Sequence, residues 1–149
     1  MIVRWILAAT HLLALGIGLG AILDRWWSLR GPLDASGLRR VLRADVLWGV
    51  AAFLWISTGL LRAFAGFEKG TAYYLGNHVF LTKMGMLLLI LILEVPAIAT
   101  FTRWRAQLAR GAAVDTTRAE VLIRISLIQT VLVVLMVFAA TAMARGFGA

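Results

Sequence analysis

The chain has 149 residues, of which 62% are hydrophobic, and it carries 15 lysines and arginines against 7 acidic residues. Soluble domains are roughly half apolar, so a soluble core does not explain this excess. The chain contains no cysteine, which excludes disulfides, thiolate zinc sites and cysteine-ligated iron–sulfur clusters.

Long uncharged runs predict four transmembrane helices in a single domain covering residues 1–149, because about 20 apolar residues are enough to cross a bilayer as a helix. We expect these helices at about Val3–Trp26, at about Ala44–Phe64, from the N-cap Asn77 to about Arg105, and after Thr117 to about Ala144. The connections are short, so neighbouring helices should be antiparallel. The predicted fold is an all-α integral membrane bundle of four helices.

The connections carry signals of their own. Gly31-Pro32 is a turn signal, and residues 34–43 after it predict a short basic amphipathic segment on the membrane surface. Residues 65–77 predict a glycine-rich loop whose tyrosines lie among the lipid headgroups. Pro96, inside the third helix, predicts a kink or a free carbonyl near Ile92.

The basic residues are distributed unevenly along the chain. Ten of the 15 fall around the first and third connections, and five fall on the opposite side. The positive-inside rule then places the arginine-rich connections in the cytoplasm and both termini outside, as in a multi-pass protein of the bacterial inner membrane. We expect these charges to contact lipid headgroups, not nucleic acid.

His11 is the one ionisable side chain in the nineteen-residue stretch Trp5–Leu23. A titratable group inside hydrocarbon is costly, which makes it a functional-site hypothesis. The rise of 1.5 Å per residue places several other polar groups and a tryptophan in the same half of the bilayer. They are Trp55, Arg62, His78, Thr82 and Lys83, with Glu68 in the loop as the one nearby acid.

This excess of positive groups predicts an anionic ligand, and haem b fits it. His11 and His78 would ligate the iron, and Arg62 and Lys83 would pair with the propionates. Gly18, on the face of His11, would admit a porphyrin edge, and Trp55 belongs to an aromatic stripe that ends at Arg62.

Each of these residues also has a structural interpretation, which we leave open. His11 would hydrogen-bond across the bundle, His78 would be a residue of the helix cap, Trp55 would be part of the core, and Lys83 would extend to the interface.

A second polar set lies in the other half of the bilayer and predicts a structural ion network, because buried charges must be paired. Its expected members are Asp24, Arg25, Asp45, Glu94 and Arg124. We expect Arg124 or Arg25 to pair with Glu94, and a proton relay through Glu94 is the alternative.

Gly16 and Gly20 form a G-x-x-x-G pair that predicts helix packing within the bundle, a homodimer contact, or room for a flat cofactor. Met84-Gly85-Met86 suggests copper, since methionine and histidine bind Cu(I). Residues two apart on a helix point about 200° from one another, however, so these two sulfurs should not converge.

Parts of the chain resemble the CopD-like group of bacterial membrane proteins, and most closely an uncharacterised family of four-helix inner-membrane proteins within it. The similar positions are His11 with the glycine-rich stretch to Arg25, Trp48-Gly49, Ser57-Thr58-Gly59 and Leu81-Thr82-Lys83. The HemJ-type protoporphyrinogen oxidases of this group are similar in a histidine, an arginine and a lysine around a b-type haem. The resemblance implies functional roles for His11, Arg25 and Lys83.

Three functions follow as hypotheses. The first is binding of b-type haem for electron transfer or porphyrin-related redox chemistry, and whether the protein is an enzyme is left open. The second is an accessory or scaffold subunit of a larger membrane complex, which has no activity of its own. The third is transport of copper or protons.

Overall fold

The computed structural model describes residues 1–67 and 69–148, where all regular secondary structure is helical. The helices are α1 (Ile2–Arg30), α2 (Ala35–Phe64), α3 (Thr71–Gly76), α4 (His78–Ala109) and α5 (Ala119–Ala144). Four of them, α1, α2, α4 and α5, are long and apolar enough to cross a membrane. The prediction of an all-α fold with four membrane-spanning helices is therefore confirmed. Which end faces outward stays a prediction.

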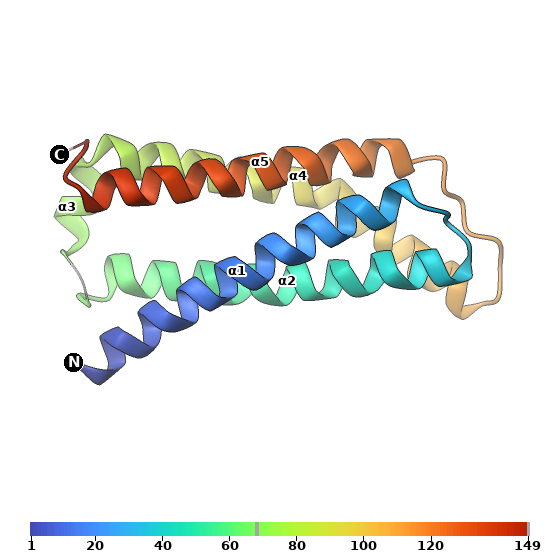
Figure 1. Ribbon diagram of the computed structural model, residues 1–149, viewed down its shortest axis with the longest axis horizontal. Coiled ribbons are helices and arrows are strands. Elements are labelled where there is room, and N and C mark those ends of the chain that lie inside the picture. The colour runs from blue at the N-terminus through green and yellow to red at the C-terminus, as the bar shows by residue number, and fades with distance from the viewer. Residues whose placement is uncertain (68, 149) are drawn as a thin grey trace.

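The four long helices run antiparallel in sequence order (Figure 1). Both termini and α3 lie at one end of the molecule, and the α1–α2 and α4–α5 connections lie at the other. α1 packs along α2 and also on α5, and α4 packs on α5, whereas the backbones of α2 and α4 come close at few positions. α2 and α4 are therefore joined mainly by side chains, such as Val41 with Phe101 and Ala63 with Phe80.

One face of α1 makes its contact with α2, at residues spaced by seven. His11 meets Thr58, Gly18 meets Trp48 and Ala51, and Arg25 meets Asp45. We call His11, Gly18 and Arg25 the α1 stripe. Residues seven apart lie almost two full turns apart, which explains why all three point toward the same neighbour.

Gly18 is a helix-packing residue. A Cβ added to it would lie 3.4 Å from Ala51 Cβ and 3.5 Å from the Trp48 ring. In this structure the Trp48 indole packs on Gly18, and the expected contact of Gly18 with a porphyrin edge stays a prediction. Gly16 and Gly20 are exposed, and a Cβ added to either would meet nothing within 4 Å, so Gly18 makes the packing contact expected of that pair.

The helix boundaries differ from prediction at the first connection. α2 begins at Ala35, so the expected surface segment 34–43 forms the first turns of α2 itself. The Asp34 carboxylate caps α2 by accepting the Gly37 N–H at 2.8 Å, and nothing in the following turns interrupts the helix. The Gly37 N–H also holds the pKa of this carboxyl below its usual value.

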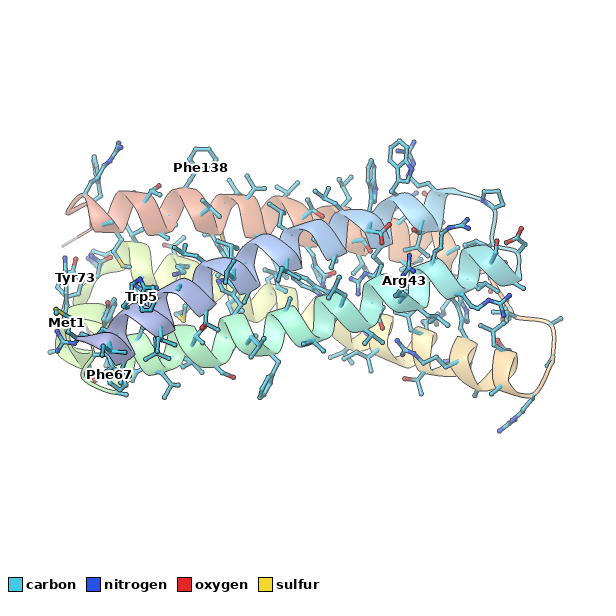
Figure 2. All side chains as sticks on the ribbon, turned by 60° about the horizontal axis from the view of Figure 1, so that its bottom comes forward. Met1, Trp5, Arg43, Phe67, Tyr73 and Phe138 are labelled. Carbon is cyan, nitrogen blue, oxygen red and sulfur yellow. The ribbon has the colours of Figure 1, made fainter. Side chains whose placement is uncertain are left out.

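At the other end, the N-cap role of Asn77 is confirmed, since its side-chain oxygen accepts the Phe80 N–H at 3.0 Å. α3 was not expected, because the glycines at 66, 70 and 76 suggested an open loop. α4 continues without interruption through Pro96. Trp5 and Tyr73 lie at the terminal end of the molecule and Arg43 toward the opposite end (Figure 2).

Candidate binding cavity

A cavity of about 440 Å³ lies at the end of the bundle that carries the termini. Side chains of all five helices line it, among them His11 of α1, Arg62 of α2, Tyr73 of α3, Lys83 of α4 and Met136 of α5. Ligand pockets in proteins typically measure about 300–1,000 Å³ and combine an apolar lining with a few polar groups. We call this space the His11 cavity.

The hydrogen bonds of His11 fix which ring nitrogen carries the proton. His11 Nδ1 lies 3.0 Å from Thr58 Oγ1. The single hydroxyl proton of Thr58 is donated to a backbone carbonyl, that of Leu54 at 2.6 Å. Thr58 Oγ1 must therefore accept from His11, so Nδ1 carries the hydrogen and Nε2 keeps its lone pair. This is the arrangement found in metal-ligating histidines, whose other nitrogen donates to a neighbouring oxygen.

Two residues of α2 fit around the imidazole. A Cβ on Gly59 would lie 3.0 Å from His11 Cε1, so a larger residue there would push the ring away. The Trp55 indole lies beside His11 with 6.0 Å between ring centroids and 35° between ring planes. The imidazole is thus positioned by a hydrogen bond, an aromatic neighbour and the missing side chain of Gly59.

The polar groups of the His11 cavity mostly donate hydrogen bonds or carry positive charge. Arg62, Lys69 and Lys83 all line it, and no carboxylate does so among the residues that the structure describes. Lys83 Nζ has no hydrogen-bond or ion-pair partner within residues 1–67 and 69–148. Trp55 Nε1 is buried and has no hydrogen-bond partner in the same ranges. Such a lining matches a ligand with acceptor oxygens or negative charge.

A second polar cluster lies farther along the α1 stripe, at Arg25. Fourteen positions separate it from His11, which is about 21 Å along a helix axis. The guanidinium is fully buried, with 0% of the residue exposed. Its NH1 group donates to Asp45 Oδ1 at 3.0 Å and to Glu94 Oε1 at 2.9 Å.

The remaining donors of Arg25 are also satisfied. Nε donates to Ser126 Oγ at 3.1 Å, and NH2 donates to Glu94 Oε2 at 3.3 Å and to Gln129 Oε1. All five N–H groups of the guanidinium therefore have acceptors. Glu94 also accepts from Trp48 Nε1 at 3.2 Å and from Gln129 Nε2 at 2.7 Å. We call Arg25, Asp45, Glu94, Arg105, Ser126 and Gln129 the Arg25 centre.

The comparison with known families identifies one match. The family described as predicted membrane protein (DUF2214) matches residues 3–148. The chain belongs to this family. No curated protein and no solved structure matches it significantly. The resemblance to CopD-like proteins and HemJ-type oxidases stays a prediction.

The structure of this DUF2214 protein brings together most of the residues expected at the ligand site. His11, Trp55, Arg62 and Lys83 all line the His11 cavity. His78 does not, because it is the first residue of α4 and its side chain is exposed. The structure therefore does not bring His78 to the cavity with His11, and a ligand role for His78 stays a prediction. Glu68 lies outside the described residues.

The expected ion network is also only partly assembled. Arg25, Asp45 and Glu94 meet, but Asp24 does not join them and instead accepts the Ser28 hydroxyl at 3.2 Å. Adjacent residues on a helix point about 100° apart, so Asp24 and Arg25 face different surroundings. Arg124 is exposed and pairs with Glu120, one turn away on α5.

Several residues of these sites had no role assigned to them from the sequence. Thr58 and Gly59 position His11, and Met136 and Met143 line the His11 cavity from α5. Met136 and Met143 are seven residues apart, which places them on one face of α5. This spacing could have predicted that both line the same space. At the Arg25 centre, Arg105 donates a hydrogen bond to the second carboxylate oxygen of Asp45 at 2.6 Å. This contact was not predicted from the sequence.

Proposed function

We propose that this membrane protein binds a b-type haem in the His11 cavity and serves electron transfer or porphyrin-related redox chemistry in the bacterial inner membrane. The observation that carries the proposal is His11 itself. Thr58 holds the Nδ1–H, so the Nε2 lone pair is available to an iron inside an apolar, partly enclosed space.

The other lining residues fit the same cofactor. A haem carries two propionates, and Arg62 and Lys83 supply the cations that would pair with them. Met136 and Met143 are the thioethers lining the cavity, and a methionine is an established second axial ligand beside histidine. Bound haem would supply one-electron chemistry, while the protein orients it and excludes water.

Absorption spectroscopy tests this proposal directly. Protein purified in mild detergent from haem-replete cells should show a Soret band, and His11→Ala should lose it. His78→Ala is the matched control and should keep the band, because His78 lies outside the cavity. Absence of the band from the wild-type protein refutes haem binding. A band that persists unchanged in His11→Ala refutes the ligand assignment.

One observation favours Cu(I) as a second candidate. A small inner pocket of about 40 Å³ is lined by His11, Met84 and Met136 from three different helices. Imidazole and thioether groups are Cu(I) ligands, and here the two methionines that line the pocket come from different helices. The neighbouring Lys83 cation opposes this occupant. Titration with Cu(I) against a competing chelator, with Met84→Leu as the variant, separates copper from haem.

The accessory-subunit hypothesis makes the opposite prediction for both experiments. A scaffold would purify stably with other membrane subunits, without a Soret band and without Cu(I) affinity.

A further inference from the structure

The small inner pocket beside the His11 cavity is lined by His11 of α1, Met136 of α5 and apolar residues of α2 and α4. The backbones of α2 and α4 come close at few positions, whereas α1 packs on both α2 and α5. Beside the pocket, Ala63 and Phe64 of α2 contact Phe80 of α4. Leu60 of α2 and Leu87 of α4 are among the apolar residues of the pocket.

We call the space walled by Leu60, Met84 and Leu87 the α2–α4 opening. Leu60 is 44% exposed on the outer surface, and it also lines the inner pocket. In a membrane-spanning helix such an exposed leucine contacts lipid. Leu60 therefore lies both on the outer surface of the bundle and at the inner pocket.

The inner end of this opening is polar. Lys83 lines both the inner pocket and the larger cavity, and its ammonium has no partner among the described residues. Trp55 lines both spaces as well, is only 6% exposed, and offers an indole N–H that is buried and without a partner in that part of the chain. A buried donor without a partner, such as Trp55 Nε1, is costly unless water or a ligand supplies an acceptor.

A cationic inner end and an apolar opening to lipid together match one kind of molecule. We propose that the ligand is an anionic amphiphile that enters from the bilayer through the α2–α4 opening. Its acidic group ends at Lys83 and Trp55, and its apolar part lies between α2 and α4. The identification of haem within this class rests on the proposed function, since haem is apolar and carries two carboxylates.

Oleate tests the ligand class without any iron. Native mass spectrometry of the detergent-purified protein with added oleate should show one retained oleate. Lys83→Met should weaken this retention by about tenfold or more, because a charge-assisted hydrogen bond is lost. Arg4→Met, an exposed cation outside the cavity, should leave it unchanged. No retained oleate, or equal retention by the two variants, overturns the proposal.

A matched pair of leucines tests the route. Leu60 and Leu61 are 44% and 46% exposed on the same helix, but only Leu60 lines the inner pocket. Leu60→Trp should slow the uptake of hemin from phosphatidylcholine vesicles and weaken oleate retention, and Leu61→Trp should do neither. Equal behaviour of the two variants overturns access through the α2–α4 opening.

The two probes separate this inference from the haem proposal. If the wild-type protein retains oleate but takes up no hemin, haem binding fails and the amphiphile site stands. If hemin binds with a Soret band but oleate neither binds nor displaces it, haem binding stands and the extension of the site to anionic amphiphiles other than haem fails.

Discussion

The Arg25 centre and the His11 cavity lie on the same face of α1, about 21 Å apart, and they handle buried polarity in opposite ways. At Arg25 every guanidinium N–H has an acceptor, drawn from α2, α4 and α5. At His11 the indole N–H of Trp55 and the ammonium of Lys83 have none among the described residues. A polar cluster satisfied within the protein stabilises the fold, whereas donors without a protein partner are left to bind water or a ligand.

The two regions also differ in how they join the helices. Asp45 and Glu94 are linked through Arg25, and Arg105 of α4 binds Asp45 of α2 directly. These contacts connect α2 and α4, whose backbones come close at few positions. At the His11 end no ion pair between the two helices is seen among the described residues; apolar contacts of Ala63 and Phe64 with Phe80 join them there, and the α2–α4 opening lies beside these contacts. Ion pairs thus join α2 and α4 at the Arg25 end of the bundle, and the α2–α4 opening lies at the His11 end.

The largest expected effect comes from Arg25→Met. Removing the guanidinium leaves the Asp45 and Glu94 carboxylates without their central cation, which should cost about 3–5 kcal/mol of unfolding free energy. Thermal unfolding in detergent measures this loss. Arg30→Met, an exposed arginine on the same helix, is the control and should change stability by less than about 1 kcal/mol.

A triple variant keeps this prediction testable if Arg25→Met does not fold. Adding Asp45→Asn and Glu94→Gln removes the uncompensated charges and should recover part of the lost stability. If Arg25→Met unfolds at the same temperature as Arg30→Met, the Arg25 centre does not hold the bundle together.

The next effect concerns His11 and its orientation. Thr58→Val removes the acceptor of the His11 Nδ1–H at nearly constant side-chain shape. Loss of such a partner typically lowers metal affinity by about 10- to 100-fold. Haem titration followed at the Soret band measures the affinity, and Ser57→Ala is the neighbouring control. Unchanged affinity in Thr58→Val would show that Thr58 does not orient the ligand.

Lys83→Met should change the unfolding free energy by less than Arg25→Met does, and in the opposite direction. Without ligand, the ammonium is a cation in a membrane-spanning helix that lacks a partner among the described residues, so its replacement should stabilise the protein by about 1 kcal/mol. The unfolding temperature of the ligand-free protein checks this. A destabilisation as large as that of Arg25→Met would place Lys83 with the structural charges.

The smallest expected effect concerns Asp34, which lies outside both regions and serves as a control. The Gly37 N–H, and after it the Ser36 hydroxyl, hold the pKa of Asp34 below its usual value. The pKa of Asp34 is thus lower in the folded than in the unfolded protein. The stability that the Asp34 carboxylate contributes is therefore complete above about pH 4 and is lost as the pH falls through the folded pKa. Compared with Asp34→Asn, the wild-type protein should lose stability only in acid. A difference that grows at neutral pH would contradict this origin.

The helices were predictable because their signal is local. Uncharged runs indicated the four spans, and the Asn77 side chain marked the start of α4. The start of α2 was placed too late, since the polar turns 35–43 lack the hydrophobicity on which span prediction depends. α3 was missed because a six-residue helix between glycines has no distinctive sequence pattern.

The sites were predictable only as far as depth determines them. The rise per residue placed His11, Trp55, Arg62 and Lys83 at one level, and all four line the cavity. Which side chains meet also depends on how each helix is rotated about its axis. That rotation separates Asp24 from Arg25, keeps Arg124 on the surface, and brings Thr58 to His11.

The pairing of charges in the Arg25 centre has a consequence for biogenesis. Arg25 and Asp45 lie on the first two helices of the chain, and Glu94 and Arg105 lie together on α4. The first hairpin and α4 each carry one positive and one negative member of the centre. Within the first hairpin the buried Arg25 therefore already has the Asp45 carboxylate as a partner, and its bidentate contact with Glu94 then joins this hairpin to α4.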